Sequence, residues 1–381
     1  MTSATVTRPL IQPPRKPRSR RWAPRIWEGC NLFAWLHLLW RGRFAIHPKF
    51  WHIAIIVTIV STFHSLVRLL QQFFYGRAIA RTVIAEAPIF IIGHWRTGTT
   101  WLHELLVLDE RHTYPTTYEC FDPNHFLLTE GFFKRWMSFL LPSRRPMDNM
   151  AAGWDRPQED EFAICMLGQP SPYLTIAFPN QPPKFPEYLD LQGPTPRALT
   201  SWKKTFLHFL QTLTFKDPRR LVLKSPPHSC RIRVLLEMFP RARFVHIMRD
   251  PYLVVPSTIH MWKSLYKSHG LQKVKHINLD EYVFSNFERL YARLEEGKNL
   301  IPAGQFHEMH YEDLVRDPEE QMKLLYDNLQ LEGFDRLSPR LRDYLKTTAG
   351  YERNRYKQDP EKQHHITERL GDVIRRYGYE R

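Results

Sequence analysis

One short segment limits the fold of this chain more than any other, because residues 88–108 combine three consecutive signals. The run from Pro88 to Gly93 is continuously apolar, which is typical of a strand buried in a parallel sheet. Gly93 and Gly98 then enclose a loop with G-x-x-x-x-G spacing, and residues 101–108 follow with the apolar face of a helix. This order predicts a three-layer α/β domain: a P-loop-like parallel sheet flanked by helices.

The loop has the chemistry of an anion site, although it differs from the usual nucleotide loop. Backbone N–H groups and a helix N-terminus bind phosphate in such loops. Thr99 and Thr100 occupy the positions of the usual Lys-Ser/Thr pair, and Arg96 offers guanidinium donors from inside the loop. A P-loop kinase or NTPase is an alternative, but it calls for the missing lysine and for an acid that holds a metal.

Two further segments end in cations where strands are expected to end. Residues 220–224 form an apolar run that ends at Lys224, and residues 242–248 lead to Arg249, with Ser257 eight residues further on. The carboxyl ends of parallel strands meet at one edge of a sheet, where ligands bind. We therefore expect Arg96, Lys224 and Arg249 to converge on a polyanion with phosphates at more than one place.

These elements resemble the sulfotransferase family, which transfers a sulfuryl group from 3′-phosphoadenosine-5′-phosphosulfate (PAPS) and releases 3′-phosphoadenosine-5′-phosphate (PAP). The similarity runs from residue 88 to at least 330, and Pro157–Glu161 and the C-terminal tail suggest a largely bacterial branch. The resemblance implies that Arg96 and Lys224 contact the sulfuryl and bridging oxygens, and that Arg249 and Ser257 bind the 3′-phosphate. It also implies a 5′-phosphosulfate loop formed by Arg96, Thr97, Gly98, Thr99, Thr100 and Trp101.

The base that activates the acceptor has three candidates. Glu119 aligns loosely with the glutamate base of the carbohydrate and tyrosylprotein branches. His228, four residues after Lys224, competes with Glu119 for this role, because the cytosolic branch uses a histidine base. The acidic cluster Glu159–Glu161 is the third candidate, and a surface role is open for each. A sulfuryl group carries less charge than a phosphoryl group, so we expect no catalytic metal.

The N-terminal part carries a different pattern. The chain has a formal charge of +15, and only Lys and Arg occur as charged residues before Glu28. We expect a disordered basic arm at residues 1–25, a helical and membrane-associated appendage at residues 26–87, and the sulfotransferase domain at residues 88–381. The appendage fits a helix packed on the core, an interfacial anchor or a single span, although its apolar run of about 11 residues is short for crossing a bilayer.

The acceptor and the compartment are less constrained. We expect a hydroxyl- or amine-bearing carbohydrate, lipid or small molecule, and residues 169–196, rich in Pro and aromatic residues, predict either a cap over it or a packed loop. The four cysteines show neither a disulfide framework nor metal spacing. A basic membrane-surface binding protein is a non-enzymatic alternative, whereas no nucleic-acid motif is present. A bacterial enzyme is expected in the cytoplasm, peripheral on the inner membrane face, and a eukaryotic one in the Golgi lumen.

Overall fold

A five-stranded parallel sheet of order β2-β3-β1-β4-β5 forms the centre of the computed structural model, which describes residues 25–136, 153–348 and 360–381. The strands are β1 (Ile89–Ile92), β2 (His112–Thr113), β3 (Arg220–Lys224), β4 (Arg243–Met248) and β5 (Phe306–His310). Ile91 pairs with Lys224 and Ile92 with His246, so the carboxyl ends of β1, β3 and β4 lie at one edge. Residues 1–24 of the expected basic arm lie outside the described residues.

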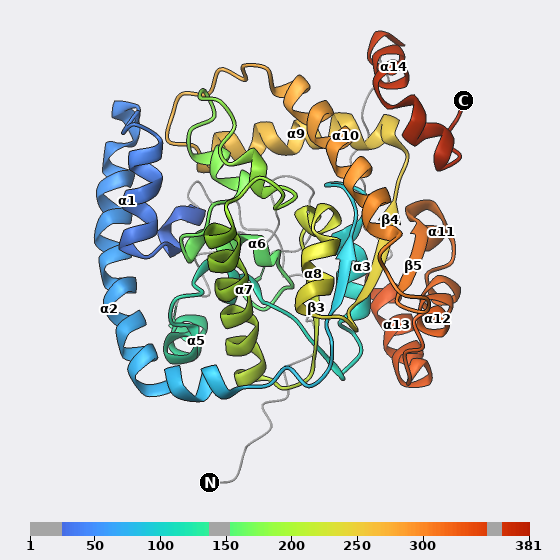
Figure 1. Cartoon of the computed structure of the whole chain (residues 1–381), viewed down its shortest axis with the longest axis horizontal. Coiled ribbons are helices and arrows are strands. Elements are labelled where there is room, and N and C mark those ends of the chain that lie inside the picture. Colours follow the sequence, from blue (N-terminus) through green and yellow to red (C-terminus); the bar gives the residue numbers. More distant parts are fainter. Residues whose placement is uncertain (1–24, 137–152, 349–359) are drawn as a thin grey trace.

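Helices pack around this sheet (Figure 1). They are α1 (Leu32–Arg41), α2 (Trp51–Arg81), α3 (Thr99–Leu106), α4 (Thr117–Phe121), α5 (Phe126–Trp136), α6 (Asp160–Met166), α7 (Pro196–Lys216), α8 (Ile232–Met238), α9 (Pro251–His269), α10 (Leu279–Lys298), α11 (Tyr311–Arg316), α12 (Pro318–Asn328), α13 (Phe334–Thr348) and α14 (Pro360–Arg376). Short 3₁₀ turns occur at Ile26–Gly29 (η1), Pro48–Phe50 (η2), Pro172–Ala177 (η4), Pro186–Tyr188 (η5) and Pro226–Cys230 (η6).

The two faces of the sheet belong to two separate apolar cores. Successive side chains of a strand point to opposite faces, and in β1 Phe90 and Ile92 join the larger core while Ile89 and Ile91 join the smaller one. Helices α7, α9 and α10 contribute to the larger core, and α3, α12 and α13 to the smaller. The predicted three-layer α/β fold, in which helices cover both faces of a parallel sheet, is therefore confirmed.

The start of the described chain packs into the larger core. The Trp27 and Trp35 side chains are fully buried, and Trp27 Nε1 donates to the His269 carbonyl at 2.7 Å. Arg25, which the charge pattern places in the basic arm, donates from Nη1 to the Gly270 carbonyl at 2.7 Å. Residues 25–41 are thus fastened to the end of α9.

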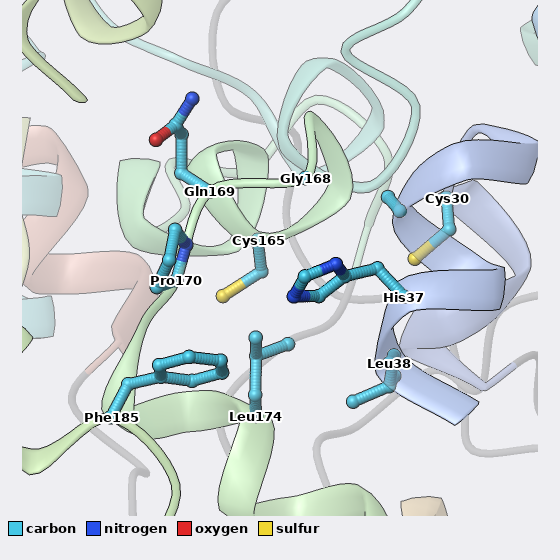
Figure 2. A pocket seen from close by; sticks show the side chains of 10 residues that line it. Cys30, His37, Leu38, Cys165, Gly168, Gln169, Pro170, Leu174 and Phe185 are labelled. Carbon is cyan, nitrogen blue, oxygen red and sulfur yellow. The ribbon is translucent and has the colours of Figure 1, made fainter. Parts of the chain in front are cut away.

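A small pocket lies between α1 and the segment 165–185 (Figure 2). Its lining includes Cys30, Leu38, Cys165 and Leu174, and none of the lining residues is a lysine, an arginine or an acid. Such a lining has no strong cation for a phosphate, although His37 and Gln169 carry N–H donors. We therefore interpret the pocket as a gap in the packing of α1.

Helix α2 is longer than the sequence pattern suggests. The 11-residue apolar run lies inside a helix of 31 residues, and residues 48–81 are long and apolar enough to cross a membrane by length and composition. Only 22% of the most apolar 18-residue window is buried inside the protein. The helix lies with α1 along one side of the molecule, at the left of Figure 1.

Candidate active site at the carboxyl edge of the sheet

The loop between β1 and α3 adopts a backbone that few residues tolerate. Gly98 has a φ of 102°, and a Cβ atom there would lie 2.3 Å from the Tyr311 ring. Arg96 is in the left-handed region as well, with a φ of 73°. Thr97, which is fully buried, donates from Oγ1 to the His94 carbonyl at 2.8 Å and closes the turn. Strain of this kind is common at ligand-binding loops.

Two of the three predicted cations meet on the β4 side of the loop. Arg96 Nε donates to Ser257 Oγ at 3.0 Å, and Arg249 Nη1 donates to the backbone carbonyl of Arg96 at 3.2 Å. The Arg249 guanidinium also lies over the Tyr311 ring, 4.5 Å from its centroid. These contacts join the end of β1, the end of β4 and the start of α9 into one cationic group.

The third cation lies on the β3 side of the same loop. Lys224 has an almost completely buried side chain, and its Nζ lies 3.4 Å from Thr100 Oγ1 at the first turn of α3. Its ion-pair partner is Glu159, at 2.8 Å between Nζ and Oε1. The structure therefore divides the predicted site into an Arg96–Arg249–Ser257 group and a Lys224–Thr100–Glu159 group.

Glu159 is further held by two aromatic side chains. Tyr173 donates its hydroxyl to Glu159 Oε2 at 2.5 Å, and Trp95 Nε1 donates to the Tyr173 oxygen at 2.9 Å. Burial and the Glu159 carboxylate raise the pKa of Tyr173 well above its usual range, so its hydroxyl stays protonated and donates. Trp95 belongs to the glycine loop, which links the orientation of Glu159 to that of the anion site.

The three consecutive acids have three different partners, at the end of β3 and in the segment that follows it. Glu159 pairs with Lys224, Asp160 accepts from His228 Nε2 at 2.7 Å, and Glu161 forms a two-armed contact with Arg231. Burial alone would raise the pKa of Asp160, but His228 and Ser225 lower it below its ordinary value. Asp160 and Glu161 are completely buried, whereas Glu159 has a side chain that is 12% exposed.

Two of the predicted bases have contacts outside the glycine loop. Glu119 caps α4: its Oε2 accepts from the Thr116 backbone N–H at 2.7 Å, and its Oε1 pairs with Lys216, at the end of α7, at 2.7 Å. His228 is completely buried between the Phe90 and Phe206 rings. Glu119 thus has Lys216 as an ion-pair partner, and His228 is enclosed in the larger core.

The remaining predicted residues line the loop and its helix. Thr99 is buried, Thr100 is half-buried beside Lys224, and Trp101 lies 6.2 Å from the Tyr311 ring between centroids. Sequence reasoning named Glu159 only as one of three acids and Tyr173 only as an aromatic residue of the Pro-rich segment. Much of that segment is packed, with Tyr173, Phe178 and Tyr188 buried, which favours the packed loop over the open cap.

Comparison with known proteins adds independent observations. Residues 88–336 match the model of the sulfotransferase family. Two curated relatives, from Mycobacterium bovis and Mycobacterium tuberculosis, are named omega-hydroxy-beta-dihydromenaquinone-9 sulfotransferase Stf3. Each is 52% identical over 367 residues, which cover 96% of this chain and 94% of the relative.

Solved structures agree on the fold. Sulfotransferase STF9 from Mycobacterium avium superposes with a TM-score of 0.64 at 20% identity, covering 90% of this chain and 95% of that one. Sulfotransferase STF1 from Mycobacterium tuberculosis gives a TM-score of 0.52 at 16% identity, with 84% and 86% covered. At these identities the likeness concerns the fold alone.

Proposed function

The chain belongs to the sulfotransferase family, and we propose that it transfers the sulfuryl group of PAPS to a hydroxyl group of a membrane lipid. The observation that carries the choice of donor is the convergence of Arg96, Lys224 and Arg249 from three strand ends around a glycine loop. The sequence suggested two alternatives, a kinase-like enzyme and a non-catalytic basic protein. The match to the sulfotransferase family supports neither of them.

The two cationic groups fit two ends of the donor. We propose that Arg249 and Ser257 bind the 3′-phosphate, and that Arg96, a residue of the glycine loop whose Nε donates to Ser257 Oγ, connects this group to the 5′-phosphosulfate loop. The loop from Thr97 to Trp101 would bind the 5′-phosphosulfate through backbone N–H groups and hydroxyls. Lys224 is then the cation nearest the reacting bond, beside Thr100.

Glu159 is our proposed general base. The acceptor oxygen attacks sulfur in line, the bond from sulfur to the bridging oxygen breaks, and the acceptor proton passes to a Glu159 oxygen. Lys224 leaves its ion pair with Glu159 and neutralises the charge that develops on the bridging oxygen. The pair thus supplies the acid-base partner and the electrostatic partner from one contact.

The acceptor class follows from the relatives and from the outer face of α2. The curated relatives are named for an omega-hydroxy dihydromenaquinone, so we propose a long isoprenoid lipid that carries a hydroxyl group. Such an acceptor resides in a bilayer, and the enzyme must therefore reach a membrane surface.

Helix α2 presents several buried polar side chains to the protein and an apolar stripe to the outside. The side chains that face the protein are the polar Ser61, His64 and Gln71 together with the apolar Val57 and Ile79, all buried. The opposite stripe is apolar and exposed: Ile55, Ile59, Leu66, Leu70 and Phe73 are all at least half accessible. Positions three and four apart lie on one helix face, so these side chains form a continuous stripe.

The helix is held against the protein along its length. Trp35 Nε1 donates to Thr58 Oγ1 at 2.9 Å, Leu127 N to Gln71 Oε1 at 3.0 Å, and Gln211 Nε2 to the Thr82 carbonyl at 3.1 Å. A helix fixed in this way supports an interfacial anchor more than a span. The segment between Glu28 and Glu86 contains lysines and arginines but no Asp or Glu, which suits contact with anionic headgroups. We propose the cytoplasmic face of the membrane as the working site.

Vesicle flotation tests the anchor. The protein should float with vesicles that contain phosphatidylglycerol, and Phe73→Glu should reduce the bound fraction by about ten-fold or more, because one buried aromatic ring contributes roughly 1.5–3 kcal/mol. Ile277→Glu is the matched control, since Ile277 is also exposed but precedes α10. Equal losses in both variants would contradict the proposed face.

A thermal-shift titration tests the donor. PAP should raise the Tm without a metal, because a ligand at roughly 100 times its dissociation constant stabilises the folded protein by about 2.7 kcal/mol. ADP with Mg²⁺ should not raise the Tm. The result that would reject this donor is stabilisation only by ADP with the metal.

A further inference from the structure

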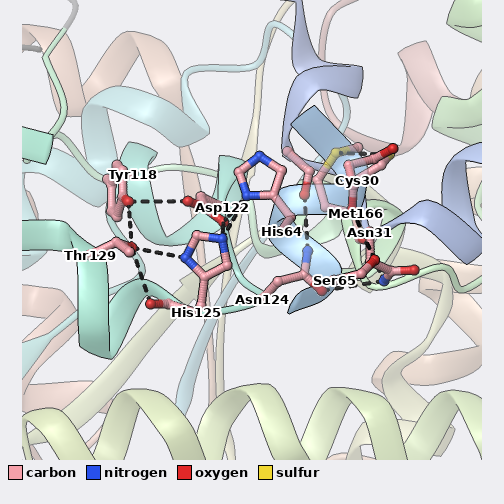
Figure 3. Close-up of polar contacts among 12 residues, drawn as sticks. Cys30, Asn31, His64, Ser65, Tyr118, Asp122, Asn124, His125, Thr129 and Met166 are labelled. Carbon is pink, nitrogen blue, oxygen red and sulfur yellow. Dashed lines mark hydrogen bonds and ion pairs between the residues drawn. The ribbon is translucent and has the colours of Figure 1, made fainter. Parts of the chain in front are cut away.

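A buried cluster of possible metal ligands lies apart from the sulfuryl site, between α2 and the core (Figure 3). It contains His64 from α2, Asp122 from the end of α4, and His125 just before α5. His64 Nδ1, His125 Nε2 and one Asp122 oxygen all lie within 4.8 Å of one another. The three side chains converge although two of them are 61 residues apart.

The hydrogen bonds around His125 and Asp122 orient both side chains. Tyr118 donates its hydroxyl proton to Asp122 Oδ2 at 3.1 Å. Thr129 Oγ1 lies 2.8 Å from the Tyr118 oxygen and donates to the His125 carbonyl at 3.1 Å. In the tautomer that carries its proton on Nδ1, His125 donates to Thr129 Oγ1 at 2.9 Å, and its Nε2 then has a lone pair that faces the cluster.

The other two members also present acceptor atoms. Asp122 Oδ1 is buried and has no hydrogen-bond partner among the described residues. The His64 ring bonds to the backbone of Glu28, and Nε2 is the nitrogen left for that bond because Nδ1 faces His125. His64 Nδ1 and His125 Nε2 lie 2.6 Å apart and share a hydrogen bond, and Asp122 Oδ1 faces both nitrogens. A bound metal ion would displace the proton of that hydrogen bond and leave three donor atoms directed at one place.

The separations suit a small tetrahedral ion. Asp122 Oδ1 lies 3.5 Å from His64 Nδ1 and 3.4 Å from His125 Nε2. Ligand atoms about 2.0–2.1 Å from a tetrahedral zinc ion are roughly 3.3 Å apart. The two ring nitrogens, at 2.6 Å, would need to separate by about 0.7 Å to reach that spacing.

We propose that His64, Asp122 and His125 bind a zinc ion that fastens α2 to the catalytic domain. Two imidazoles and a carboxylate are a donor set that zinc accepts, with water as a fourth ligand. Thr129 and Tyr118 serve as the outer partners that orient His125 and Asp122, as outer hydrogen bonds do in metal sites. The ion would set the rotation of α2 about its axis and hence the direction of its apolar stripe.

Metal content tests this assignment independently of activity. The untagged full chain is stripped with EDTA, titrated with zinc against a chromophoric chelator, and assayed for bound metal by mass spectrometry. We expect one zinc ion per chain in the wild type, and loss of the ion in His125→Ala and Asp122→Asn. His52→Ala, an exposed histidine on the same helix, is the matched control and should retain the ion.

Two further readouts keep the test decisive if a variant folds poorly. Zinc should raise the Tm of the wild type and of His52→Ala, but not of His125→Ala. Cobalt added to the stripped wild type should give the visible absorption of a tetrahedral site. A wild-type protein that holds no zinc and shows no such band, or equal zinc affinity in His125→Ala and His52→Ala, would overturn the proposal in favour of a hydrogen-bonded cluster without metal.

Discussion

Replacing Glu159 with glutamine separates base catalysis from donor binding. Glutamine keeps the shape of the side chain and an oxygen that accepts from Tyr173, so the local packing should survive. The variant loses the proton acceptor, and a positioned general base contributes about 10²–10⁴ in rate, or roughly 2.7–5.5 kcal/mol of transition-state stabilisation. It also releases Lys224 from a carboxylate 2.8 Å away, so the anionic product PAP should bind equally well or more tightly.

The assay is kcat at saturating PAPS with a hydroxylated lipid acceptor in vesicles, together with PAP affinity by calorimetry. We expect Glu159→Gln to lose about two to four orders of magnitude in kcat. Glu119→Gln is the matched control: it keeps an oxygen that can accept from the Thr116 N–H but removes the charge that pairs with Lys216, and should cost about 1–2 kcal/mol in stability while kcat changes little. If Glu159→Gln keeps its kcat and Glu119→Gln loses it, Glu119 is the base and our reasoning from the Lys224 contact fails.

Three other predictions concern donor recognition, buried charge and pH. Arg249→Leu should weaken binding of PAP far more than binding of the analogue without a 3′-phosphate, which calorimetry compares directly. Arg231→Leu leaves Glu161 buried without its partner and should cost about 3–5 kcal/mol in denaturant unfolding, part of which the double variant with Glu161→Leu recovers. Burial, with a smaller effect from Lys224, lowers the pKa of His103 to about 3, so the unfolded chain takes up this proton first as the pH falls below 6.5. This histidine should lower the free energy of unfolding by about 1.4 kcal/mol at pH 5.5. His103→Gln should remove that loss, which denaturant unfolding at several pH values measures.

The sheet and the loop could be predicted because their signals are local. A short apolar run followed by two glycines at fixed spacing encodes strand, loop and helix within 21 residues, and the positive φ at Gly98 explains why glycine stands there. The convergence of Arg96, Lys224 and Arg249 followed from one topological rule about parallel strands. The pairs that complete the site did not follow.

The pairing of Glu159–Glu161 illustrates what the sequence lacked. Three adjacent acids look equivalent in the chain, yet one caps the start of α6 while the next two belong to its first turn, so they point to different partners. Only the placement of α6 beside the end of β3 assigns Lys224 to Glu159 and His228 to Asp160. Glu119 was a reasonable candidate by alignment, but its partners Thr116 and Lys216 become visible only when α4 and α7 are in place.

Helix α2 shows how polar residues that interrupt an apolar run can be misinterpreted. The apolar run seemed too short because polar residues follow Val60, and this shortness argued against a single span of the membrane. In the structure Ser61, His64 and Gln71 face the protein, where His64 and Gln71 bond to residues 125 and 127, and apolar positions between them face outward. The polar residues therefore mark the face by which the helix is attached to the domain. The proposed interfacial anchor requires the apolar stripe of α2 to face lipid, so the contacts of His64, which help to set the rotation of the helix, and the direction of that stripe are one structural question.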